Sequence, residues 1–131
     1  MTGPTPSQPP QQAVVLFSHG SRDPLWRQPM EAVQVRLQSD RPDLRVTCAY
    51  LELCTPDLPT ATAQLVQHGV QHITIVPMFL GTGRHAREDL PRIVDELRQA
   101  HAGVQFDVQH AVGEDARMTA LMAQIAGEIA P

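Results

Sequence analysis

Short apolar stretches alternate with segments of helical periodicity along almost the whole chain, and this alternation limits the possible folds more than any other feature. The apolar stretches predict strands at Ala13–Phe17, Leu44–Leu51, His72–Met78 and Val104–Val108. The other segments predict helices at Arg27–Ser39, at Leu58–His68, around Leu90–Leu97 and from Asp115 to about Glu128. Such a pattern is typical of an α/β fold, a parallel sheet with helices on both faces. Right-handed crossovers make 2-1-3-4 the simplest strand order.

The same periodicity predicts which helix residues face the core. Gly69 is expected as the left-handed cap that ends the second helix. Pro91 is expected in the first turn of the third helix, where its missing N–H is not needed. The residues expected to point inward are Leu90, Ile93, Val94 and Leu97 in the third helix and Met118, Leu121, Met122 and Ile125 in the last.

The length of the chain indicates a single domain. Its 131 residues, 42% of them hydrophobic, suffice for one core and not for two. The first dozen residues are mostly Pro, Gln, Thr and Ser, which bury too little apolar area to offset the entropy lost on ordering. We therefore expect a disordered lead at 1–12 and one α/β domain at 13–131.

The charged residues exclude several classes of function. The formal net charge is -4, which argues against general nucleic-acid binding. All ten basic residues are arginine, so neither a Schiff-base lysine nor a P-loop lysine is possible. Arginine suits the bidentate binding of carboxylate or phosphate groups. The sequence therefore favours a small anionic ligand over a nucleic acid.

The cysteines and the apolar runs indicate the cellular environment. Cys48 and Cys54 are too few for a zinc or iron–sulfur site and do not resemble a disulfide framework. Cys48 falls within a predicted strand and is expected to be a buried, inert thiol. No signal-like segment opens the chain, and no apolar run approaches the ~20 residues of a membrane span. We expect a soluble, cytoplasmic protein without a membrane partner.

Three side chains suited to metal binding follow the first three predicted strands. His19 follows the first strand, Glu52 the second and His85 the third. Neighbouring strands lie about 4.8 Å apart, and their carboxyl ends share one edge of the sheet, so these side chains can converge there. Two imidazoles and one carboxylate with open positions suit a divalent transition metal such as iron, cobalt or nickel. A structural zinc site would instead be closed by four protein ligands.

Simpler interpretations exist for each histidine. A lone histidine at a strand end is more often a surface or hydrogen-bonded residue, and Glu52 alone could cap the following turn. His68 and His101 lie near predicted helix C-termini, where an imidazolium is mildly favourable. His72 opens a strand. His110 ends the fourth strand and could approach the crevice at the carboxyl ends of the strands.

A glycine-rich segment after the third strand imitates a dinucleotide-binding motif. Residues 81–86 fit G-x-G-x-x-G/A. The motif follows the third strand rather than the first, and the next strand ends in Gln109 and His110 instead of an acidic residue for a ribose. We therefore do not expect a nucleotide. A phosphate is more plausible than a nucleotide here, because these backbone amides could hold it beside Arg84 and Arg87.

Three motifs together resemble those of the class II tetrapyrrole chelatases. They are HGSRDP at 19–24, AYLE at 49–52, and PMFL at 77–80 followed by Gly83, His85, Asp89, Leu90 and Pro91. The motifs occur in the order and at the spacing of that family, over the chain from Ala13 to the last helix. The chain is most similar to the short-form sirohydrochlorin cobaltochelatases and the related sirohydrochlorin ferrochelatases.

The resemblance implies a single chelatase-like lobe that inserts a divalent metal into sirohydrochlorin, in cobalamin or siroheme biosynthesis. Cobalt is the expected metal, with iron and nickel as alternatives. His19, Glu52 and His85 would bind the incoming metal and act in catalysis, since an imidazole can also accept a pyrrole proton near neutral pH. The metal is a substrate, and no organic cofactor is implied.

The resemblance also implies how the substrate is held. Sirohydrochlorin is a flat macrocycle fringed with carboxylates, which arginines can bind. The residues expected to contact it are Ser21, Arg22, Gly83, Arg84 and Arg87. Larger chelatases carry two lobes in one chain, so the short form implies a homodimer around a shared cleft.

Two other functions stay open. A non-catalytic metal-binding or delivery protein could use the same His-Glu-His site without metallating any tetrapyrrole. A phosphate-handling enzyme with a phosphorylated histidine is a third class. Its motif would more naturally read Arg-His-Gly, whereas Ser18 precedes His19 here.

Overall fold

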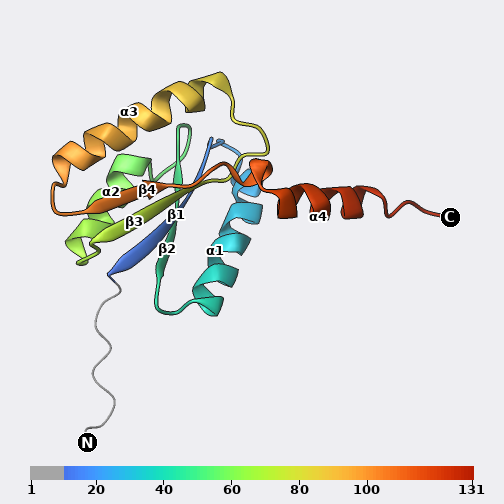
Figure 1. Cartoon of the computed structure of the whole chain (residues 1–131), viewed down its shortest axis with the longest axis horizontal. Helices are drawn as coiled ribbons and strands as arrows, with labels where there is room; N and C mark the ends of the chain where they lie inside the picture. Colours follow the sequence, from blue (N-terminus) through green and yellow to red (C-terminus); the bar gives the residue numbers. More distant parts are fainter. Residues whose placement is uncertain (1–10) are drawn as a thin grey trace, which may run out of the picture.

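The computed structural model describes residues 11–131 and contains a four-stranded sheet in the order β2-β1-β3-β4 (Figure 1). All three strand pairs are parallel. The strands are β1 (Gln12–Ser18), β2 (Arg45–Tyr50), β3 (His72–Pro77) and β4 (Gln105–Val108). The helices are α1 (Gln28–Asp40), α2 (Leu58–Gln67), α3 (Arg84–Ala100) and α4 (Ala116–Ala126), with 3-10 turns η1 (Pro24–Arg27) and η2 (Val112–Glu114). The predicted α/β class and strand order are confirmed.

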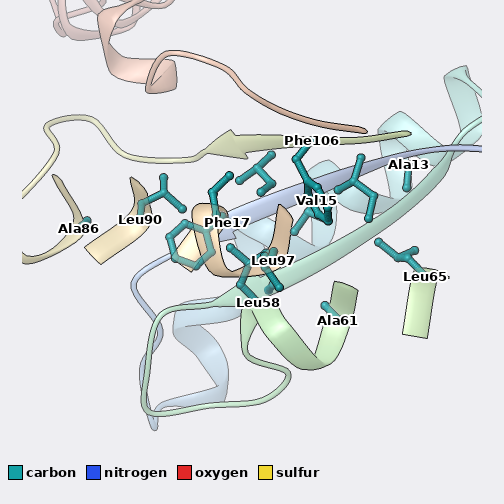
Figure 2. Packing of buried hydrophobic residues seen from close by; sticks show 14 of the residues in the cluster. Ala13, Val15, Phe17, Leu58, Ala61, Leu65, Ala86, Leu90, Leu97 and Phe106 are labelled. Atoms are coloured by element: carbon teal, nitrogen blue, oxygen red, sulfur yellow. The ribbon is translucent and has the colours of Figure 1, made fainter. Parts of the chain in front are cut away.

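Two apolar layers hold the sheet between helices. The larger layer joins β1, β3 and β4 to α2 and α3; Figure 2 shows Val15 and Phe17 of β1 close to Leu58 of α2 and Leu97 of α3. The smaller layer lies under α1 on the other face and includes Leu16 and Cys48. Each strand contributes side chains to both layers, because successive side chains of a strand point to opposite faces of the sheet.

Helix α2 has a defined cap at each end. Asp57 caps its first turn, with a carboxylate oxygen accepting from the Thr60 N–H at 2.8 Å. After the helix, Gly69 has a φ of +88°, which confirms the predicted left-handed cap. The His68 ring nitrogen Nδ1 lies 2.7 Å from the Gln64 carbonyl oxygen, so this side chain contacts the last turn of its own helix.

The prediction for Pro91 is wrong. Helix α3 begins at Arg84, so Pro91 lies inside the helix rather than in its first turn. The apolar pattern of α3 begins at Leu90, so it does not mark the first turn of the helix. That turn contains Ala86, which is fully buried one turn before Leu90. Pro91 is exposed, and its ring nitrogen cannot donate to the turn before it.

The prediction that the last helix points inward is also wrong. No residue of α4 is buried, and Leu121 and Ile125 are 49% and 58% exposed. Figure 1 shows α4 leaving the carboxyl side of the sheet and pointing away from it. The apolar periodicity is real, but it indicates a surface that packs against something and not which surface that is.

The remaining boundary differences are small. The predicted lead at 1–12 lies outside the described residues apart from Gln11 and Gln12, and Gln12 is already the first residue of β1.

Among the helices that the structure describes, none combines the length and the apolar character that crossing a membrane requires.

Candidate functional site

The carboxyl ends of β1 and β2 are joined by direct backbone contact. The N–H of Leu51 donates to the Ser18 carbonyl at 2.9 Å, and that of Glu52 donates to the His19 carbonyl at 3.0 Å. Gly20 has a φ of +99°, and a Cβ added there would lie 1.7 Å from the Glu52 carbonyl oxygen. Only glycine fits this position, because it has no Cβ and tolerates a positive φ. The corner brings His19 and Glu52 together.

The His19 ring is held by the loop that follows β3. Its centroid lies 4.5 Å from that of the Phe79 ring, at an interplanar angle of 38°. A Cβ added to Gly83 would lie 3.9 Å from His19 Cε1. The strand before this loop is fixed by the Met78 N–H, which donates to the Phe17 carbonyl at 2.7 Å. His19 therefore lies between the ends of β1 and β3 and next to the start of α3.

His85 occupies the first turn of α3. Gly83 is the N-cap residue, and it supplies no side-chain cap. The first amides of a helix carry a partial positive charge and accept anions. The His85 side chain is exposed to solvent, whereas the next residue, Ala86, is fully buried. The helix thus anchors through Ala86 and presents His85 at the same edge of the sheet as His19.

Three arginines lie in the two segments that carry His19 and His85. Arg84 and Arg87 are exposed on the first turn of α3, and the Arg84 Nε lies 3.0 Å from a carboxylate oxygen of Glu88. Arg22 is exposed in the turn after β1. In the same turn the Ser21 hydroxyl oxygen accepts from the Asp23 N–H at 3.1 Å. Three exposed guanidinium groups and the partly buried Ser21 therefore lie in the turn after β1 and in the first turn of α3.

Glu52 also borders a hollow of about 500 Å³ between the β2–α2 loop and the start of α2. Leu53, Asp57 and Gln64 are among its other lining residues, and neither His19 nor His85 lines it. Within residues 11–131, no three His, Cys, Asp or Glu side chains are arranged as a metal-binding group. The structure thus joins Glu52 to His19 through the backbone, and it places His85 on the neighbouring helix turn.

Side chains before Glu52 are buried on the α1 side of the sheet. Burial, followed by the nearby Cys48, raises the pKa of Tyr50 to about 12. Burial likewise raises the pKa of the Cys48 thiol, which lies 3.3 Å from the Gln34 side-chain oxygen. The prediction of a buried thiol at Cys48 is confirmed. Both groups stay protonated at neutral pH and support the corner without ionising.

Two features of this edge were missed by sequence reasoning. The ring contact between Phe79 and His19 had its signal in the PMFL motif, where an aromatic residue follows the third strand. The close approach of Gly20 to Glu52 had a weaker signal, a glycine directly after a histidine.

His110 follows the end of β4. Its side chain is 96% exposed, and its Nδ1 is 3.7 Å from a Glu114 carboxylate oxygen.

Comparison with known proteins identifies the class that this fold and site define. The family model described as CbiX matches residues 13–129. In a crystal structure from Marinobacter aquaeolei VT8, a protein described as a CbiX protein of cobalamin (vitamin B12) biosynthesis is 29% identical. It aligns over 89% of this chain and 95% of that one, with a TM-score of 0.78. The chain belongs to the CbiX family.

Two further relatives are named for their activity. A sirohydrochlorin cobaltochelatase of Methanopyrus kandleri is 35% identical over 82 residues, which are 63% of this chain and 57% of that protein. The sirohydrochlorin chelatase SirB of Bacillus subtilis subspecies spizizenii, solved in complex with cobalt, is 25% identical with a TM-score of 0.73. That alignment covers 92% of this chain and 51% of SirB. The chain thus spans little more than half the length of either protein.

Proposed function

We propose that this protein inserts a divalent metal, cobalt first, into sirohydrochlorin with release of the two pyrrole protons. The observation that carries the proposal is the corner at Gly20, which joins His19 to Glu52 beside the arginine-bearing start of α3. Relatives named as sirohydrochlorin chelatases, one of them solved with cobalt, support this choice of substrates. Cobalamin biosynthesis is the pathway that we favour, and siroheme biosynthesis is the alternative.

The proposed roles follow from the chemistry of each group. His19, Glu52 and His85 bind the incoming metal as a partial ligand set, which leaves positions open for the pyrrole nitrogens. The imidazole of His19 or His85 takes a pyrrole proton as the metal enters, because histidine changes charge near neutral pH. Cobalt, or iron or nickel in its place, is consumed as a substrate, and the reaction needs no organic cofactor.

The macrocycle is proposed to lie across the same edge. Its peripheral carboxylates bind the guanidinium groups of Arg22, Arg84 and Arg87, which form charge-assisted hydrogen bonds. Gly83 lets the ring approach the helix start closely, and Ser21 adds a hydroxyl. These contacts bind the ring before and after metal insertion, so they act on substrate affinity more than on the chemical step.

We further propose that the protein acts in the cytoplasm as a homodimer. A single lobe aligns with 51% of the length of SirB, so a second copy of this chain can supply a second lobe. The resulting cleft would enclose a flat macrocycle that one open crevice leaves exposed to water.

The experiment that tests the function is incubation of the purified protein with sirohydrochlorin and Co²⁺, Fe²⁺ or Ni²⁺ while the absorption spectrum is followed. We expect the spectrum of the metallated macrocycle to form fastest with cobalt and much faster than without protein. If a protein shown to bind metal leaves the spectrum unchanged with all three metals, the metal-delivery function replaces the enzyme. Phosphorylation of His19 by a phosphodonor would instead indicate the phosphate-handling class.

A further inference from the structure

A buried aromatic side chain lies against the His19 ring. The centroids of the His19 and Phe79 rings are 4.5 Å apart, with 38° between their planes, and Phe79 itself is only 4% exposed. On another side, a Cβ added to Gly83 would lie 3.9 Å from His19 Cε1. Contacts through carbon atoms orient an imidazole without occupying its nitrogens, which are the atoms that bind a metal.

Two other histidines of the chain are oriented through a ring nitrogen. His68 Nδ1 lies 2.7 Å from the Gln64 carbonyl oxygen, and His72 Nε2 lies 2.6 Å from a carboxylate oxygen of Asp107. A metal-binding imidazole commonly has its second nitrogen fixed by an outer partner of this kind. The contact that the structure shows at His19 is aromatic instead, so the orienting role falls to a phenyl ring.

Phe79 is itself fixed by elements that carry none of the proposed ligands. The Phe17 ring packs edge-on against it, with the centroids 6.0 Å apart and the planes at 75°. The Phe79 carbonyl accepts from the N–H of Gly113, a residue of η2, at 2.8 Å. A Cβ added to Gly113 would lie 1.8 Å from the carbonyl oxygen of Leu80. The segment between β4 and α4 thus holds the backbone of the residue that packs against His19.

We propose that Phe79 is a positioning residue for the metal site, whose ring fixes the direction in which the His19 nitrogens meet the metal. An imidazole that is free to rotate has to be immobilised when the metal binds, and the entropy lost in this step weakens binding. Packing against Phe79 removes that cost before the metal arrives. The role of His19 as a ligand rests on the proposed function, whereas the ring contact does not depend on it.

Cobalt titration without tetrapyrrole tests this role. Phe79→Leu should weaken cobalt binding about 10-fold. Phe79→Tyr keeps the ring and should bind cobalt like the wild type. The matched control is Phe106→Leu, which should not change cobalt affinity. Phe106 is also 4% exposed in the same apolar layer, and its ring neighbour, His101 at 6.4 Å, is not a proposed ligand. Equal losses in the two leucine variants would overturn the proposal.

A double-mutant cycle separates positioning from a general effect on the fold. If Phe79 acts through the imidazole, Phe79→Leu should cause no further loss of cobalt affinity in a His19→Ala background. A full additional loss there would overturn the proposal. Weak binding in His19→Ala together with wild-type binding in Phe79→Leu would overturn the positioning role alone. Coupling between the two residues without insertion of cobalt into sirohydrochlorin would refute the proposed function and leave the positioning role standing.

Proton NMR of the metal-free protein covers the case in which Phe79→Leu does not fold. The His19 ring protons should resonate upfield of those of His110, whose side chain is 96% exposed, because they lie against the Phe79 ring. The His19 signals are assigned by their absence from the spectrum of His19→Ala. Wild-type His19 signals at the positions of an exposed imidazole would overturn the proposal.

Discussion

The two sides of the candidate site are built in different ways. At the β1–β2 corner, backbone hydrogen bonds and the Gly20 contact fix both segments, and the Phe79 ring packs against the His19 ring. At the start of α3, His85 and Arg84 stand exposed on a helix that is anchored by the buried Ala86. The β1–β2 corner thus holds its geometry by close packing, whereas the start of α3 presents exposed, charged and flexible side chains. A metal site needs fixed ligand positions, as at the corner. Binding of a carboxylate-bearing ring can rely on exposed arginines, as at the start of α3.

The largest effect is expected from Gly20→Ala, which breaks the packed corner. The new Cβ meets the Glu52 carbonyl, and the positive φ adds strain of about 1–3 kcal/mol. We expect a clear loss of thermal stability together with a loss of cobalt binding, measured by calorimetric melting and titration. Gly69→Ala is the matched control: Gly69 also has a positive φ, but nothing lies within 4 Å of the added Cβ. Equal effects of both changes would show that the close approach is unimportant.

The next effect concerns the metal ligands on both sides. Wild-type protein should bind about one cobalt per chain, and His19→Ala or His85→Ala should each weaken that binding more than ~10-fold. Glu52→Gln should weaken it less, because water can replace a carboxylate oxygen. His68→Ala is the control, since this ring contacts the Gln64 carbonyl at the end of α2. If affinity is unchanged in both histidine variants, the ligands lie elsewhere.

A smaller effect is expected from the exposed side of the site. Arg84→Ala should raise the KM for sirohydrochlorin about 10-fold with little change in kcat, as the loss of one charge-assisted contact of ~1.4 kcal/mol implies. Arg92→Ala is closely matched, because both arginines are exposed on α3 and paired with a glutamate four residues later. Arg92 lies two turns further from the site, so its KM should not change. A fall in kcat alone for Arg84→Ala would contradict a role in holding the ring.

The smallest effect is expected for the ionisation of Tyr50 beside the packed corner, which should need a higher pH than that of an ordinary tyrosine. Burial raises the pKa of Tyr50 to about 12, above the ordinary value of 10, so the folded state keeps a proton that the unfolded state loses. This contribution to stability is complete below pH 10 and is lost as the pH rises toward 12. Tyr50 is the only tyrosine in the chain, so tyrosinate absorbance reports on it alone. Titration at the ordinary pKa in folded protein would mean that the corner is open to water.

The sequence predicts the sheet well because strand length and apolar alternation are local properties. The order 2-1-3-4 followed from the handedness of the crossovers, and the placing of His19, Glu52 and His85 after three strands followed from the strands themselves. The start of α3 was missed because Ala86 contributes little to an apolar pattern despite being fully buried. The Gly20 contact depends on two segments meeting in space, which no local pattern records.

The direction of α4 was beyond sequence reasoning for a related reason. The apolar side of α4, which includes Leu121 and Ile125, predicts a helix face that packs against an apolar surface. In the structure that face stays exposed, and α4 follows a segment in which a Cβ added to Gly113 would lie 1.8 Å from the Leu80 carbonyl oxygen. Periodicity thus predicts an apolar face, and the backbone geometry determines where that face lies.

The central claim, that the packed corner performs metal insertion, is tested most directly by the turnover of His19→Ala with cobalt and saturating sirohydrochlorin. The variant should keep the wild-type affinity for the macrocycle, since the arginines are unchanged, and should lose most of kcat. Sirohydrochlorin binding measured by fluorescence quenching and cobalt insertion measured by absorbance separate the two quantities. Insertion at the wild-type rate in His19→Ala would contradict the account.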